Sequence, residues 1–147
     1  MRDVGKRFRN YAIIAVTETG LGNTAVLQNH MPRHKIYQLP AKTPGQGGAG
    51  IAVLVGPRYA PYTSLQECGV DPDTSCLWIK LAAVGTHLEK DLYVGTFYVP
   101  PASSTQLRGP DASLDCRYQR LLQHSAHFWG KGHVVLCGDF NASVGDL

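Results

Sequence analysis

The sequence has little of what marks membrane, secreted or zinc proteins. No apolar run in the 147-residue chain approaches the roughly 18 residues that a membrane-spanning helix needs. The first ten residues are basic and polar, without an apolar segment that a signal peptidase would recognise. The four cysteines form no C-x-x-C pair and have no partnered histidine spacing, which argues against a zinc site and a disulfide framework. We therefore expect a soluble intracellular protein that does not bind membranes; a nuclear location stays open.

Repeats, low-complexity tracts and nucleotide-binding loops are also missing. The glycine-rich stretch 44–48 is followed by neither a Walker motif nor a dinucleotide-binding motif. With 44% hydrophobic residues, the chain can bury a core as a single domain spanning residues 1–147. The net charge is only +3, although four cations lie in the first nine residues. That cluster is compatible with a solvated helix face or with a patch that binds nucleic-acid phosphates.

What is present is a series of short apolar segments and one long amphipathic helix. A helix is predicted to end near residue 10, and 21–32 is expected to be a loop with at most one helical turn. Residues 34–39 and 49–55 flank a turn-forming stretch, which predicts a hairpin. Few helices among many strands indicate an α+β fold with a sheet covered by helices. Strands are predicted at 11–16, 34–39, 49–55, 62–69, 76–84, 91–99 and from 134 onward.

The long helix is predicted at about 113–129, with Ser113 as its N-cap. His124 and His127 are expected on its solvent side. The stripe predicted to face a sheet consists of Leu114, Tyr118, Leu121, Leu122, Ser125, Phe128 and Trp129, and the outer row consists of Asp115, Gln119, Gln123 and His127.

Polar residues follow the last apolar run, 134–137, which is expected to be a strand buried on both faces. Asp139 comes after Gly138, and Asn141 lies two positions on. While the backbone stays extended, both side chains point the same way, which is typical of a site. An Asx turn, in which Asp139 and Asn141 bond nearby backbone groups, explains the same residues equally well.

Two other strands end in the same manner. Glu18 follows the apolar run 11–16, and Tyr98 lies near the end of 91–99, directly before Val99 and Pro100. Taken singly, Glu18 is compatible with a solvated loop residue, and Tyr98 with a core tyrosine whose hydroxyl is satisfied.

Together, these segments resemble the endonuclease/exonuclease/phosphatase superfamily, whose fold is that of deoxyribonuclease I. The style is closest to the endonuclease domains of retrotransposon-like elements and to apurinic-site endonucleases. The resemblance implies a partial four-layer α/β sandwich, mostly of antiparallel strands with covering helices. The matching segments, in the family's order, are IIAVTETGL (13–21), GGAGIAVLV (47–55), LWIKL (77–81), LYVGTFYVPP (92–101) and VVLCGDFNASVGD (134–146).

The resemblance also implies a function: a Mg²⁺- or Mn²⁺-dependent phosphodiesterase, with DNA, or else RNA, as partner. Glu18 would bind the metal, Tyr98 would contact the scissile phosphate, Asp139 would act on the attacking water, and Asn141 would donate to a phosphoryl oxygen. A hard cation of this kind needs few protein carboxylates, and in-line attack needs an oriented water with charge neutralisation.

Two family motifs have no counterpart in these 147 residues. They are an opening strand of the W-N-x-N-G type and a closing S-D-H motif. Because such domains occupy about 200 to 250 residues, we expect an incomplete domain, truncated at both ends and inactive or nearly so by itself. The alternatives are a catalytically dead remnant, a nucleic-acid-binding module, or a phosphatase that acts on inositol phosphates or phospholipid head groups.

Overall fold

The computed structural model describes residues 10–41, 50–66, 76–101 and 113–141. The helix end predicted near residue 10 and the turn predicted at 44–48 lie outside these residues. Most predicted strands are present with shifted ends, and a short helix occupies part of the loop predicted at 21–32. The elements are β1 (Ile13–Thr17), α2 (Ala25–His30), β2 (Lys35–Leu39), β3 (Ile51–Val55), η1 (Ala60–Tyr62), β4 (Thr63–Leu65), β5 (Cys76–Leu81), η3 (Ala83–Gly85), β6 (Leu92–Tyr98), α3 (Leu114–Trp129) and β7 (His133–Asp139).

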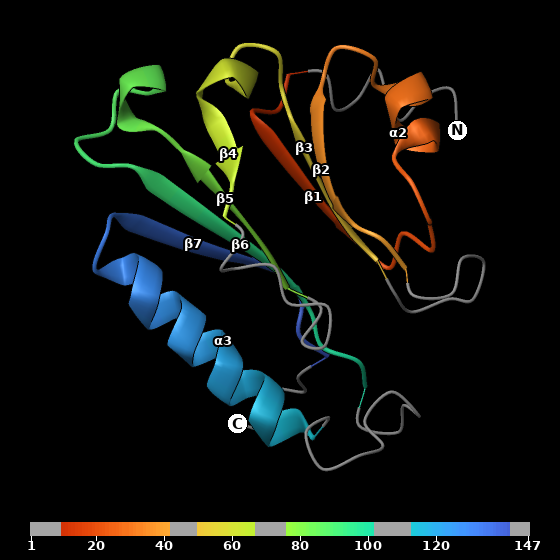
Figure 1. Cartoon of the computed structure of the whole chain (residues 1–147), viewed down its shortest axis with the longest axis vertical. Coiled ribbons are helices and arrows are strands. Elements are labelled where there is room, and N and C mark those ends of the chain that lie inside the picture. Colours follow the sequence, from red (N-terminus) through yellow and green to blue (C-terminus); the bar gives the residue numbers. More distant parts are fainter. Residues whose placement is uncertain (1–9, 42–49, 67–75, 102–112, 142–147) are drawn as a thin grey trace, which may run out of the picture.

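The strands form two sheets, each built from one continuous part of the chain (Figure 1). The first sheet has the order β1-β3-β2 and is antiparallel throughout, so the predicted hairpin between β2 and β3 is confirmed. The second sheet has the order β4-β5-β6-β7. Its last pair, β6 and β7, is parallel because α3 carries the chain back across the sheet between them.

The two sheets pack face to face, and each helix covers one outer face. Side chains of both sheets share an inner core, which includes Val53 from the first sheet and Ile79 from the second. Met31, beside α2, packs on the outside of the first sheet, whereas Leu121 and Phe128 of α3 pack on the outside of the second. The layers are therefore helix, sheet, sheet and helix, which confirms the α+β class and the four-layer sandwich.

Alternation along β5 assigns its side chains to the two faces of the second sheet. Leu77 and Ile79 face the inner core, and Trp78 faces α3. The Trp78 ring lies 4.5 Å from the Phe128 ring, centroid to centroid. This contact fixes α3 on the outer face of the sheet.

The face that α3 buries is narrower than the predicted stripe. Ser113 caps the helix as predicted, accepting a hydrogen bond from the Cys116 N–H, and the predicted polar row is exposed. Leu122 and Trp129, however, are 61% and 73% exposed, so their predicted burial is wrong. They lie one residue beyond Leu121 and Phe128, about 100° further round the helix, where the sheet no longer reaches.

His124 also departs from its predicted place on the solvent side. It is half-buried, and its Nδ1 atom lies 3.6 Å from the Cys76 Sγ atom of β5. His127, by contrast, is exposed as predicted.

The prediction that 134–137 is buried on both faces is wrong as well. Val135 and Leu136 are 46% and 41% exposed. The reason is the position of β7: it is the last strand of the described sheet and pairs only with β6. An apolar run fits a central strand, but here one side of the strand lacks a neighbour among the described residues.

Within the described residues, no helix is long and apolar enough to cross a membrane.

Candidate active site

Three polar side chains predicted as site residues come together where three strands end. Glu18 directly follows β1, while Tyr98 and Asp139 are the last residues of β6 and β7. Tyr98 lies opposite Asp139 in the parallel register, so both side chains belong to the same end and face of the sheet. β1 contacts both β6 and β7, and the three strands run toward the same region in Figure 1. We call Glu18, Tyr98 and Asp139 the strand-end cluster.

The Tyr98 hydroxyl is the centre of this cluster. Tyr98 is buried, and it shares a side-chain hydrogen bond with Glu18, to whose carboxylate the phenol donates. Burial, followed by this hydrogen bond and the negative charges of Glu18 and Asp139, raises the pKa of Tyr98 to about 12. The phenol therefore stays protonated near neutral pH and acts as a hydrogen-bond donor. Glu18 itself is exposed, so its carboxylate is reachable from solvent.

The loop after β7 holds Asp139 through its own backbone. The Asn141 N–H donates to the Asp139 Oδ1 atom at 2.9 Å, which is the Asx turn left open by the sequence. The Asn141 side chain donates from Nδ2 to the Val99 carbonyl at 2.8 Å, and the Val99 N–H donates to the Asp139 carbonyl at 2.8 Å. These bonds tie the ends of β6 and β7 together, so the turn and the site are one structure.

Because the backbone turns at Asn141, the predicted parallel arrangement of the Asp139 and Asn141 side chains is not formed. Asn141 has a φ of 42°, in the left-handed region, and not the extended conformation that the alignment required. Its amide is directed at Val99 instead. Asn141 thus braces the cluster in this structure.

Left-handed backbone at non-glycine residues is confined to this region of the described chain. The two examples are Glu18, with a φ of 53°, and Asn141. Such conformations cost on the order of 1 kcal/mol and cluster at functional sites. Gly138, with a φ of 141°, comes so close to β6 that an added Cβ would lie 2.0 Å from the Phe97 carbonyl oxygen. The glycine before Asp139 is therefore required by strand contact.

Arg117 is the residue that the sequence reading did not select. It lies on the buried face of α3 and is only 7% exposed. Its positive charge acts on Tyr98, opposing the rise in the pKa of that phenol. A signal was available: Arg117 stands four residues before Leu121, within the apolar stripe, where a charge is unexpected.

The donor set fits a divalent cation held by few protein ligands. No group of three or more His, Cys, Asp or Glu side chains in the described residues is placed to enclose a metal. Mg²⁺ does not require such an enclosure, since it keeps several waters and takes one or two carboxylates together with substrate phosphate. The exposed Glu18 and the half-buried Asp139, both near Tyr98, provide a set of this kind.

A cavity of about 780 Å³ lies at the opposite ends of these strands, away from the cluster. It is lined by the first residues of β1 and β6, by η3 and by several aromatic side chains, including Tyr59 and Tyr62. No carboxylate lines it. The strand-end cluster and this cavity are therefore separate features of the described chain.

The fold is a two-sheet sandwich with acidic and phenolic side chains at converging strand ends. The family model described as the endonuclease/exonuclease/phosphatase family matches residues 1–147, so the chain belongs to this family. The resemblance seen in the sequence is thereby confirmed.

Solved structures support the same fold at low sequence identity. The human Nocturnin catalytic domain with bound sulfate has a TM-score of 0.58 and 14% identity over 92% of this chain and 53% of its own. ANGEL2, a 2',3'-cyclic phosphatase, has a TM-score of 0.61 and 16% identity over 97% and 44%. A mannosyl-6-phosphatase from Bacteroides thetaiotaomicron has a TM-score of 0.59 and 13% identity over 97% and 57%.

The chain therefore spans about half the length of the structures it resembles. No protein with a curated description matches it in sequence. At these identities, the likeness concerns the fold.

Proposed function

We propose that the chain is part of a divalent-cation-dependent phosphodiesterase that hydrolyses DNA, an endonuclease. The observation that carries the proposal is the convergence of Glu18, Tyr98 and Asp139 at the ends of three strands, with the Tyr98 hydroxyl bonded to Glu18. In a phosphodiesterase, such a cluster supplies a cation ligand, a protonated donor and a carboxylate for water.

In this proposal, Glu18 holds Mg²⁺ or Mn²⁺, with Asp139 close by. The ion supplies neutralising charge for the phosphate oxygens when it is bound. Glu18 suits this role because its carboxylate is exposed and already fixed by Tyr98.

Asp139 orients the attacking water and accepts its proton. The Asx turn leaves the Oδ2 atom of Asp139 for this task, since the Asn141 N–H occupies Oδ1. Tyr98 would have to release the Glu18 carboxylate in order to donate its single phenol proton to a phosphate oxygen. Asn141 would have to release the Val99 carbonyl in order to donate to a phosphoryl oxygen.

DNA is proposed as the substrate on two grounds. The five sequence segments are closest in style to endonuclease domains, and the net charge of +3 suits a polyanion. RNA is the alternative nucleic acid. A phosphatase is the second candidate, favoured by similarity to structures described as a 2',3'-cyclic phosphatase and a mannosyl-6-phosphatase.

The test compares nicking of supercoiled DNA, cleavage of RNA and release of phosphate from inositol phosphates, each with Mg²⁺ and with chelator. It uses this chain and a polypeptide extended to the length of the structural neighbours. We expect Mg²⁺-dependent nicking by the extended form and little by the 147-residue chain, because losing part of a catalytic set removes most of the rate.

Glu18→Gln and Asp139→Asn are expected to lower nicking at least about 100-fold, the scale of a lost charge-stabilising group. Asp115→Asn is the matched control, because this exposed carboxylate lies on the outer row of α3. Unchanged nicking in the two site variants would overturn the site assignment. Faster phosphate release than nicking would favour the phosphatase, and DNA binding without cleavage by the extended form would indicate a remnant or a binding module.

A further inference from the structure

Arg117 is a buried cation on the face of α3 that packs against the second sheet. It is 7% exposed and lies on the same face as Leu121 and Phe128, four and eleven residues further along the helix. Removing a charge from water costs several kcal/mol unless its surroundings compensate. A cation in this place therefore needs nearby negative charge or acceptors.

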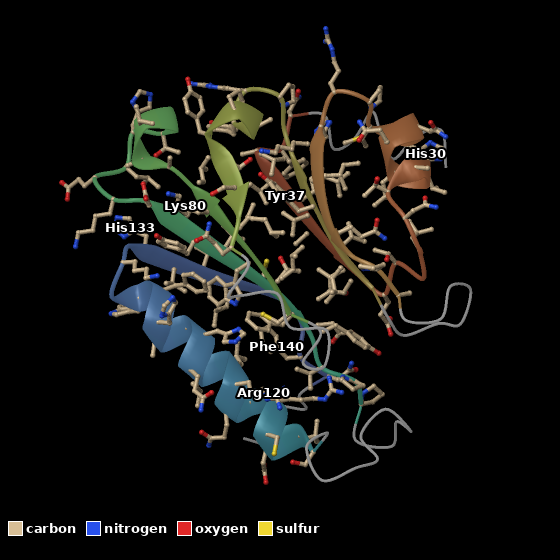
Figure 2. All side chains as sticks on the ribbon, in the orientation of Figure 1. His30, Tyr37, Lys80, Arg120, His133 and Phe140 are labelled. Atoms are coloured by element: carbon tan, nitrogen blue, oxygen red, sulfur yellow. The ribbon has the colours of Figure 1, made fainter. Side chains whose placement is uncertain are left out.

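The packing of α3 places Arg117 at the ends of the strands. Phe128 stacks on Tyr93 of β6 with ring centroids 4.9 Å apart. From Phe128 back to Arg117, the helix advances about 16 Å, the same distance that five residues cover along a strand. Because α3 runs back along the sheet from the end of β6 to the start of β7, this brings Arg117 level with Tyr98 along the strands (Figure 2 shows the helix lying along the sheet). Arg117 lies on the outer face of the sheet and Tyr98 on its inner face, so the charge of Arg117 acts on the cluster past the strand ends.

Two further contacts support this register. The hydroxyl of Tyr118, next to Arg117, donates to the Phe140 carbonyl at 3.1 Å, so the first turns of α3 are tied to the loop after Asp139. Phe140 also stacks on Phe97, with centroids 6.3 Å apart. The charged groups acting on Tyr98 are Glu18, Asp139 and Arg117.

We propose that Arg117 is a positioning residue of the strand-end cluster, whose buried positive charge offsets Glu18 and Asp139 and sets how tightly the cluster binds a divalent cation. This inference rests on the proposed function, since it needs the cation site. It assigns Arg117 no contact with the substrate.

The effect follows from charge. Glu18 and Asp139 contribute two negative charges, and Arg117 leaves the cluster with a net charge of −1. Without Arg117, the net charge is −2, and a divalent cation is held more tightly. Repulsion between a single and a double positive charge that are several ångströms apart in a water-like medium corresponds to about three- to tenfold in the dissociation constant.

The experiment uses Mn²⁺ alone as probe and the 147-residue chain, with free Mn²⁺ measured by electron paramagnetic resonance at low ionic strength. Arg117→Met and, as a second neutral variant, Arg117→Gln are expected to bind Mn²⁺ about three- to tenfold more tightly. Arg117→Lys keeps the charge and is expected to stay within about twofold of the original chain. Thermal unfolding reports whether each variant is folded.

Two controls separate charge from packing. Leu121→Ala removes side-chain volume from the same face without changing charge, and is expected not to tighten Mn²⁺ binding. The gain in the neutral Arg117 variants is expected to shrink as salt rises, because the Debye length falls to about 3 Å at 1 M.

The inference is overturned if the neutral variants bind Mn²⁺ as the original chain does, or more weakly, as a purely structural arginine would give. Glu18→Gln distinguishes this failure from failure of the proposed function. If Glu18→Gln weakens Mn²⁺ binding while the Arg117 variants do nothing, the cation site stands and only the role of Arg117 falls. If Glu18→Gln has no effect, the cation site itself is wrong.

Discussion

The raised pKa of the Tyr98 phenol makes the stability of the chain depend on pH in the alkaline range. Burial and the hydrogen bond to Glu18 raise the pKa of its phenol to about 12, from an ordinary value of 10.0. Between these values, the folded chain keeps a proton that the unfolded chain has lost, so the free energy of unfolding falls as pH rises from about 10 to 12 and is unaffected below that range.

Tyrosinate absorbance of the folded chain measures this prediction. Six other tyrosines titrate as well, so the Tyr98→Phe variant is subtracted. The difference spectrum is expected to appear only well above pH 10. A Tyr98 signal at its ordinary pKa would show that the phenol is neither buried nor bonded to Glu18.

The backbone conformation of Glu18 is expected to lower the free energy of unfolding. Its φ of 53° suits glycine, so the free energy of unfolding of Glu18→Gly should be about 1 kcal/mol higher than that of Glu18→Ala. Both variants lack the carboxylate and its bond to Tyr98, so the comparison isolates the backbone. Chemical denaturation measures the difference, and equal stabilities would argue against strain at this residue.

At the scale of single residues, the sequence indicated which side chains meet but not how each is held. Glu18, Tyr98 and Asp139 could be selected because each follows an apolar run, and the structure brings them together. The left-handed turn at Asn141 could not, because a local pattern does not fix φ. Arg117 was missed because its burial depends on tertiary packing.

Among the elements, α3 makes the clearest test of which face is buried. Phe128→Ala removes a buried ring that contacts Trp78 and Tyr93, and is expected to lower the free energy of unfolding by about 3 to 5 kcal/mol. Trp129→Ala removes a larger but exposed ring, and is expected to change it by no more than about 0.5 kcal/mol. Denaturant titration measures the free energy of unfolding of both variants. Comparable losses in the two variants would contradict the burial of Phe128 and the exposure of Trp129.

The limits of α3 were predictable from its cap and apolar period, and those of the strands only approximately. The width of the buried stripe on α3 was not predictable. The sequence of a helix shows which residues are apolar, whereas the extent of the sheet determines how many of those residues are buried. In β7, the exposed side chains of Val135 and Leu136 likewise show that an apolar run does not determine how much of an element is covered. Their apolar run is typical of a central strand. Only the strand pairing shows that β7 has a single neighbour, β6, in the described sheet.

For the whole molecule, the side of β7 that has no partner strand among the described residues predicts self-association. Unpaired strand edges with apolar side chains are templates for pairing with other chains. Val135→Lys is expected to shift sedimenting material toward monomer, because a lysine on an edge strand opposes such pairing. Leu122→Lys, which places the same charge at an exposed apolar position on α3, serves as control and is expected to have a smaller effect.

The division of the sheets along the chain has a consequence for biosynthesis. The described strands of the first sheet have all been synthesised once β3 is made, whereas those of the second sheet end with β7, so 84 residues (56–139) separate the two events. At about 5 to 20 residues per second, the first sheet waits several seconds on the ribosome for its partner. Throughout that time, the inner face carrying Leu39, Ile51 and Val53 is bare. The nascent chain thus presents a preformed apolar surface, which is the feature that chaperones at the ribosome exit bind.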